Sequence, residues 1–144
     1  MVLSILLSCI LIGLGSIHFY WAFGGKFGFA RTLPTKITGE KVLNPKKIDC
    51  LIVAFVLTLF GVFYAIESGL IVFKLSEWII SYVSWIIPII FILRAIGEFK
   101  FVGFFKSVKE TNFGKSDTKI YTPLCLIIGI LGITITLLKF YHAH

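Results

Sequence analysis

Charged residues are scarce in this chain of 144 residues. Asp, Glu, Lys and Arg make up 15% of the positions, against roughly 25% in soluble domains, and 58% of the positions are hydrophobic. Seven acidic and fourteen basic residues could not cover the surface of a soluble domain of this size. The composition therefore excludes a soluble globular enzyme, a disordered segment and a coiled coil, and it leaves an integral membrane protein.

Cysteine is scarce as well, and its pattern excludes further classes. Cys9, Cys50 and Cys125 form no CxxC pair and have no histidine or aspartate at ligand spacing. An odd number of scattered thiols supports neither a disulfide framework nor a zinc site, so we expect small buried side chains and neither a metal nor a cofactor. Motifs of hydrolases, metalloproteases and phosphate-binding loops are missing too, so the sequence favours no enzyme class.

Long stretches without any charged residue are present instead. They lie at positions 1–25, 50–66, 78–93 and 120–138. A membrane-spanning helix needs about 20 mostly apolar residues, so the pattern predicts four such helices and an all-α fold. We expect the spans at about 2–23, 48–68, 76–96 and 120–139. We expect a single domain over residues 1–144, an integral membrane four-helix bundle of two helical hairpins. The first stretch lacks the features of a cleaved signal, so we expect a retained helix.

The end of the second helix has two interpretations. Glu67, Ser68 and Gly69 interrupt an apolar run that resumes at Leu70. An ionisable group is costly at membrane depth. The helix therefore either ends at Gly69 or continues with Glu67 turned toward protein or water.

The basic residues predict the orientation. Twelve of the fourteen lie in the two longer connections, 26–49 and 94–119: Lys26, Arg31, Lys36, Lys41, Lys46, Lys47, Arg94, Lys100, Lys106, Lys109, Lys115 and Lys119. Lys74 and Lys139 lie on the opposite side. Because basic residues near helix ends resist translocation, we expect both long loops in the cytoplasm, and both termini and the short 67–77 connection outside. Orientation already accounts for this charge, so nucleic acid is not an expected partner.

Small residues repeat at helical spacing in three of the spans. The main positions are Ser4, Ser8 and Gly15 in the first, Ala54, Thr58 and Gly61 in the second, and Cys125, Gly129, Gly132 and Thr136 in the fourth. Such stripes let membrane helices approach closely, so they predict tight packing. The third span carries Pro88, which predicts a kink.

The segment 99–109 differs from an ordinary polar loop. Four phenylalanines alternate there with three lysines. We expect this segment to lie in the headgroup layer, with its rings toward the hydrocarbon and its amines toward anionic phosphates.

Polar and aromatic residues gather at the cytoplasmic ends of the helices. Each has a simple structural role: Arg94 and Glu98 can pair at i, i+4, Asp49 and Asp117 can cap helices, and His18 can bond to a neighbouring helix. Their convergence at one depth also predicts a ligand site. The candidate residues are His18, Tyr20, Trp21, Lys26, Arg94, Glu98, Lys100, Asp117 and Tyr121.

Three blocks of the sequence carry a family resemblance. They are HFYWAFGG at 18–25, RAIGEFKFVGFFK at 94–106, and Asp117 followed by YTPLCL at 121–126. The chain resembles a family of small bacterial four-helix membrane proteins known only as a domain of unknown function, and its lysine-rich first loop is longer than the family pattern. The resemblance implies the fold and a place in the bacterial cytoplasmic membrane, and it implies no activity.

Three functional hypotheses follow. The leading one is a non-enzymatic protein whose cytoplasmic rim binds a small anionic or lipid-headgroup ligand, or a partner protein, through basic, aromatic and imidazole side chains. The second is a structural or immunity-type protein without a pocket. The third is an intramembrane enzyme acting on a lipid-borne substrate, with His18 as base, oriented by Glu98 or Asp117 within hydrogen-bond reach, directly or through one water. Expected partners are the bilayer and, under the first hypothesis, an anionic ligand or a second protein chain.

Overall fold

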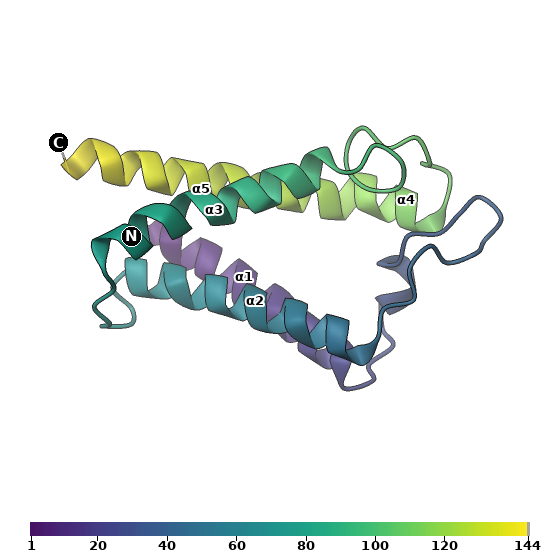
Figure 1. The fold of residues 1–144 in the computed structure, drawn as a ribbon, viewed down its shortest axis with the longest axis horizontal. Helices are drawn as coiled ribbons and strands as arrows, with labels where there is room; N and C mark the ends of the chain where they lie inside the picture. The colour runs from purple at the N-terminus through teal and green to yellow at the C-terminus, as the bar shows by residue number, and fades with distance from the viewer. Residues whose placement is uncertain (144) are drawn as a thin grey trace.

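The computed structural model describes residues 1–143 and contains four long helical elements (Figure 1). α1 is Val2–Ala22, α2 is Lys47–Glu67 and α3 is Glu77–Ile96. The fourth element is a continuous helical stretch in three parts: α4 (Asn112–Ser116), the π-helical turn η2 (Asp117–Tyr121) and α5 (Thr122–Ala143). All four elements are long and apolar enough to cross a membrane, which confirms the predicted all-α fold.

Two helix ends have clear local causes. α2 ends at Glu67, and Gly69 turns the chain with a φ of 82°, a conformation that glycine adopts without strain. The fourth element begins at Asn112, earlier than the predicted span start near residue 120. Its first turn is stabilised by Thr111, whose hydroxyl accepts a hydrogen bond of 3.0 Å from the N–H of Gly114.

The helices pair into two hairpins. α1 packs along α2, and α3 packs along α5. In Figure 1 the hairpins meet at the end that holds the N-terminus and the end of α5, which we call the terminal end, where α1 also contacts α5. They diverge toward the opposite loop end, where the short helix η1 (Phe29–Arg31) of the first loop (residues 23–46) contacts α4. The molecule is therefore V-shaped, with residues of all four helices in its buried core.

Glycines bring α1 and α2 into close contact. A Cβ atom on Gly15 would lie 2.5 Å from Thr58 Oγ1, and one on Gly61 would lie 2.5 Å from Ile12 Cγ1. The hydroxyl of Ser8 donates a hydrogen bond of 2.7 Å to the carbonyl of Gly61. The small residues of these two helices therefore pack against each other, as their spacing predicts.

Pro88 determines a polar contact between α3 and α5. Proline has no N–H, so it cannot donate to the carbonyl of Ser84 four residues earlier. The hydroxyl of Thr136 on α5 lies 2.9 Å from that carbonyl and also 2.9 Å from the carbonyl of Gly132 on its own helix, so the two acceptors share its one hydrogen. Beside it, a Cβ atom on Gly132 would lie 2.9 Å from Pro88 Cβ, so the two helices are in close contact here. A side chain of the neighbouring helix thus satisfies the acceptor that proline leaves free.

Candidate functional site

A buried ion cluster lies at the loop end. Asp117, in the π-helical turn η2, is 0% exposed. Its Oδ1 accepts a hydrogen bond of 3.0 Å from Arg94 Nη2, and its Oδ2 accepts from Lys106 Nζ at 3.0 Å and from the N–H of Gly103 at 2.9 Å. Lys106, 2% exposed, also donates to the carbonyl of Gly103. The cluster thus joins the end of α3, the following loop and the start of the fourth element.

Two glycines fold the loop onto the end of α3. Gly97 and Gly103 have φ values of 81° and 93°, which side chains with a Cβ rarely adopt. A Cβ on Gly97 would overlap the carbonyl of Val102, and the N–H of Phe104 donates to the carbonyl of Ala95 at 2.9 Å. The chain therefore turns back against the helix and brings Lys106 to Asp117.

This loop corrects part of the prediction for residues 99–109. Phe99, Phe104 and Phe105 are exposed, and Lys100 lies over the ring of Phe101 with Nζ 5.3 Å from its centroid. Lys106, however, does not extend toward solvent, because the buried carboxylate of Asp117 binds its ammonium group. The expectation that every lysine of this segment faces the headgroups is wrong for Lys106.

Two further local predictions are corrected, and one is confirmed. Arg94 pairs with Asp117 rather than with Glu98, which is exposed. Asp117 is not a helix cap, because the helix starts five residues before it and its oxygens bind Arg94, Lys106 and Gly103. Asp49 does stabilise a helix start: its Oδ2 accepts the N–H of Lys46 at 2.7 Å.

The aromatic residues at the end of α1 form a separate group. His18 Nδ1 lies 2.9 Å from the carbonyl of Leu14 on the same helix; a carbonyl can only accept, so Nδ1 donates. The imidazole packs edge-on against Trp21, with 4.9 Å between ring centroids, and the indole donates to the carbonyl of Phe27 at 2.9 Å. Half-exposed Tyr20 lies against Gly25. These contacts order the start of the first loop.

The direct contact between His18 and a carboxylate that would favour the enzyme hypothesis is not present in residues 1–143. No hydrogen bond or ion pair there joins His18 to Glu98 or Asp117. His18 bonds within its own helix, and three donors occupy the carboxylate of Asp117. Nor does that part of the chain bring together three His, Cys, Asp or Glu side chains as a metal site would need.

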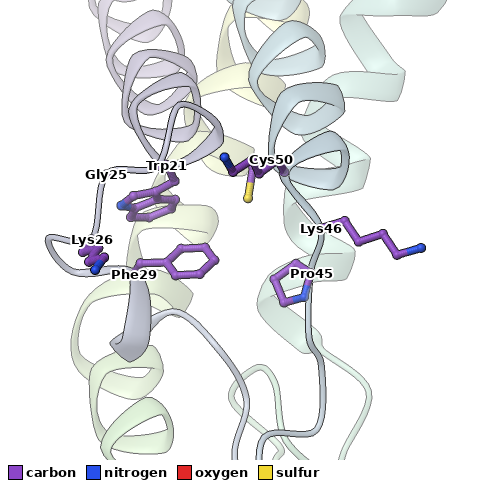
Figure 2. A pocket seen from close by; sticks show the side chains of 9 residues that line it. Trp21, Gly25, Lys26, Phe29, Pro45, Lys46 and Cys50 are labelled. Atoms are coloured by element: carbon purple, nitrogen blue, oxygen red, sulfur yellow. The ribbon is translucent and has the colours of Figure 1, made fainter.

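A pocket of about 270 Å³ lies between the start of the first loop and the start of α2 (Figure 2). The rings of Trp21 and Phe29 lie on one side of it, Cys50 and Pro45 lie on the other, and the side chain of Lys46 extends away. Lys26 also contributes to its lining. This pocket is lined largely by apolar groups.

A second pocket, of about 420 Å³, lies between the first loop and the end of α3. Apolar residues contribute most of its wall, and Arg94 and Glu98 are its charged residues; the apolar ones include Pro34, Val42, Leu43, Leu93 and Val102. The side chain of Arg94 is 35% exposed, and its Nη1 is buried without a hydrogen-bond partner in residues 1–143. Two cations and one carboxylate make up the ion cluster, so it carries one excess positive charge beside this pocket.

The nine predicted site residues therefore divide between the two hairpins. Arg94 and Asp117 are in contact, and Glu98 shares the pocket of Arg94. His18, Tyr20, Trp21 and Lys26 lie around the end of α1, Lys100 is exposed, and Tyr121 packs against Phe113. The sequence alone does not indicate Lys106 as a site residue, because its position fits the lysines that set orientation. Gly97 and Gly103, which precede Lys106 and lie six positions apart, are the feature of the sequence that indicates a loop returning to the helix.

Four membrane-length helices in two hairpins, without a catalytic constellation in the described residues, define the class as a multi-pass membrane protein. A family model described as "Protein of unknown function (DUF3995)" matches residues 11–132. The match includes the ion cluster and parts of all four helices, so the chain belongs to this family, as its three sequence blocks predict. No curated protein and no solved structure matches the chain.

Proposed function

We propose that this protein is a non-enzymatic component of the bacterial cytoplasmic membrane that binds a phosphate-bearing anion at its cytoplasmic rim. The two lysine-rich loops face the cytoplasm, and the binding group is Arg94 in the second pocket. The observation that carries the proposal is the guanidinium itself: one nitrogen binds Asp117, another is buried without a partner, and the group lies beside a pocket.

Charge supports an anionic ligand. Asp117 neutralises one of the two cations that contact it, and Lys106 is the buried one, so the surplus charge of the ion cluster lies on Arg94, whose side chain is 35% exposed. Glu98 brings a negative charge to the same pocket, but it forms no ion pair with Arg94 in residues 1–143. A guanidinium binds phosphate oxygens through paired N–H groups, and it keeps its charge at every physiological pH.

The other pocket is also lined by cations, namely Lys26, Lys46 and Lys47. It is the weaker candidate because, in residues 1–143, none of these lysines has a buried nitrogen without a hydrogen-bond partner.

Position favours a phosphate carried by a lipid. Arg94 lies in the last turn of a membrane-length helix, and Leu43, Leu93 and Val102 give its pocket an apolar wall. The many lysines of the same two loops attract anionic lipids to this surface. A soluble phosphate compound would use the same guanidinium, so the test must separate the two sources.

The test measures thermal unfolding of the protein purified in a neutral detergent. Phosphatidylglycerol, phosphatidylcholine and inorganic phosphate are added separately to the wild type, Arg94→Gln and Lys100→Gln. A ligand that binds only the folded state raises its stability, by about 2.7 kcal/mol at a concentration 100-fold above Kd. Each variant is compared with its own ligand-free unfolding temperature, so a change in basal stability does not affect the result.

We expect phosphatidylglycerol to raise the unfolding temperature of the wild type and of Lys100→Gln, the matched loss of an exposed cation. Arg94→Gln should lose this shift. Stabilisation by inorganic phosphate to the same extent would assign the site to a soluble anion. Equal stabilisation of all three proteins by phosphatidylglycerol would overturn the proposal and favour a structural role without a ligand.

A further inference from the structure

The second pocket, in which Arg94 is the proposed phosphate-binding group, also contains a free negative charge. Arg94 and Glu98 are its two charged lining residues. Glu98 is exposed and forms no hydrogen bond or ion pair in residues 1–143. A guanidinium with an unpaired nitrogen and an unpaired carboxylate therefore line one cavity of about 420 Å³.

The end of α3 keeps these two charges from pairing with each other. The helix ends at Ile96, and Gly97 turns the chain with a φ of 81°. Glu98 therefore does not continue the helix and does not lie one turn above Arg94, as an i, i+4 pair would require. Arg94 binds Asp117 instead, at 3.0 Å, so the carboxylate of Glu98 is available to a ligand.

The opposite wall of the pocket comes from the first loop and carries no charge. Pro34, Val42 and Leu43 contribute to it. The N–H of Val42 donates to the carbonyl of Pro34 at 2.8 Å, so a backbone hydrogen bond fixes this wall. The wall can contact the apolar part of a ligand, but it cannot neutralise either charged side chain.

We propose that the ligand of this pocket is a lipid headgroup of the phosphatidylethanolamine type, with its phosphate on Arg94 and its primary ammonium group on Glu98. The inference rests on the proposed function, because it places the phosphate on the same guanidinium. A headgroup with only negative charge would leave Glu98 beside a phosphate with no cation of its own. A headgroup with one negative and one positive charge matches both charged side chains of the pocket.

The lining of the pocket favours a primary over a quaternary ammonium group. A primary ammonium group has three N–H donors, and a carboxylate accepts hydrogen bonds from them. The quaternary ammonium group of choline has no N–H, and proteins bind such groups between aromatic rings. None of the described residues that line this pocket is aromatic. Ethanolamine therefore fits the pocket better than choline.

The order of the two side chains along the chain matches the order of groups in the headgroup. Arg94 lies in the last turn of α3, a helix of membrane length, and Glu98 follows the end of that helix. In the lipid, the phosphate is attached next to the glycerol and the acyl chains, and the ammonium group is at the outer end. The residue still on the membrane-length helix thus corresponds to the group nearer the hydrocarbon.

The test compares phosphatidylethanolamine, phosphatidylcholine and phosphatidylglycerol with identical acyl chains, and soluble glycerophosphoethanolamine. Each is titrated against the wild type, Glu98→Gln, Arg94→Gln and Glu110→Gln in neutral detergent, and the unfolding temperature is measured. Glu110 provides the matched control, because it is an exposed glutamate of the same loop and does not line the pocket.

We expect the wild type and Glu110→Gln to reach half of their maximal shift at the lowest concentration with phosphatidylethanolamine. Glu98→Gln should need about fivefold more of this lipid, the effect of losing a partly exposed ion pair. Its preference over phosphatidylcholine should disappear, and its response to phosphatidylglycerol should be at least that of the wild type. Equal stabilisation by glycerophosphoethanolamine would support the same charge pairing and assign it to a soluble compound.

An equal response of the wild type to phosphatidylethanolamine and phosphatidylcholine would overturn this inference, as would a preference that persists in Glu98→Gln. If Arg94→Gln still lost every lipid-induced shift in that case, the proposed function would stand without it. If Arg94→Gln kept the shifts, the proposed function itself would fail.

Discussion

Lys106 and Asp117 carry opposite charges, and both are shielded from water. A buried pair of this kind gains little over an apolar pair, because removing two charges from water is costly. The loss of one partner is much worse, since the remaining charge then lies in a medium of low dielectric constant. The pair therefore acts mainly to fix where the loop docks on the fourth element.

Asp117→Asn should lower the free energy of unfolding by about 3–5 kcal/mol, because it leaves Lys106 buried without a counter-ion. Denaturant titration in detergent measures this loss. The double variant Lys106→Met, Asp117→Leu should recover much of it, and Glu98→Gln, on the exposed surface, should change stability by less than about 0.5 kcal/mol. A loss in Asp117→Asn no larger than that in Glu98→Gln would rule out this account.

At the level of residues, the sequence predicted Arg94 and Asp117 as members of one site, and it predicted the wrong partner for each. Helical spacing reports contacts within one helix, so it paired Arg94 with Glu98. The contact with Asp117 depends on a loop that returns through two glycines with positive φ, and no periodic pattern reports that path. The sequence indicates that Glu67 is unusual, but it does not indicate its partners, because Ser84 and Lys139 lie on other helices.

Between elements, the hydroxyl of Thr136 has an unusual importance because it replaces a backbone donor. Thr136→Val keeps the shape of the side chain and leaves the carbonyl of Ser84 without a donor. We expect a loss of about 1–2 kcal/mol in unfolding free energy, measured by denaturant titration. Thr134→Val is the control, because Thr134 bonds to Ile130 in its own helix, and it should cost clearly less.

A double-mutant cycle with Pro88→Ala separates this mechanism from simple packing. Alanine restores an N–H that can bond to Ser84, so Thr136→Val should cost less in that background. Equal costs in both backgrounds would show that the hydroxyl does not compensate for the proline.

The boundaries of the elements were harder to predict than their number. The interval 112–119 carries two lysines and an aspartate, so a search for apolar runs assigns it to a loop. It is helical because Thr111 caps it and because the charge of Asp117 is paired internally. The π-helical turn at Asp117–Tyr121 adds a residue to one turn, and this changes the direction in which Asp117 points. No apolar pattern reports such a turn.

For the whole molecule, composition and charge-free runs predicted four helices in two hairpins, and stripes of small residues predicted the close faces. The divergence of the hairpins was not predictable in the same way. A stripe identifies the face of a helix that packs, but the angle between two pairs depends on which side chains fill the space between them. Contacts of α1 with α5 and of Glu67 with Lys139 join the helices of the two hairpins at the terminal end, whereas at the loop end the first loop contacts α4 through η1.

The proposed orientation can be tested with single cysteines in a variant that lacks Cys9, Cys50 and Cys125. Lys36→Cys and Lys100→Cys, one in each long loop, should react with an impermeant maleimide only after the membrane is opened. Lys74→Cys, in the short connection, should react in intact cells. Twelve of the fourteen basic residues lie in the long loops and keep those loops in the cytoplasm, so the short connection is expected outside. Labelling of Lys36→Cys and Lys100→Cys from opposite sides would refute a shared rim.

The divergence of the hairpins gives the molecule different widths at its two ends. In a bilayer, the leaflet around the loop end must make room for a broader cross-section than the leaflet around the terminal end. A protein of this shape relieves packing stress where the leaflet around the loop end is stretched and the leaflet around the terminal end is compressed. The protein should therefore collect where the membrane surface on the side of the loop end is convex.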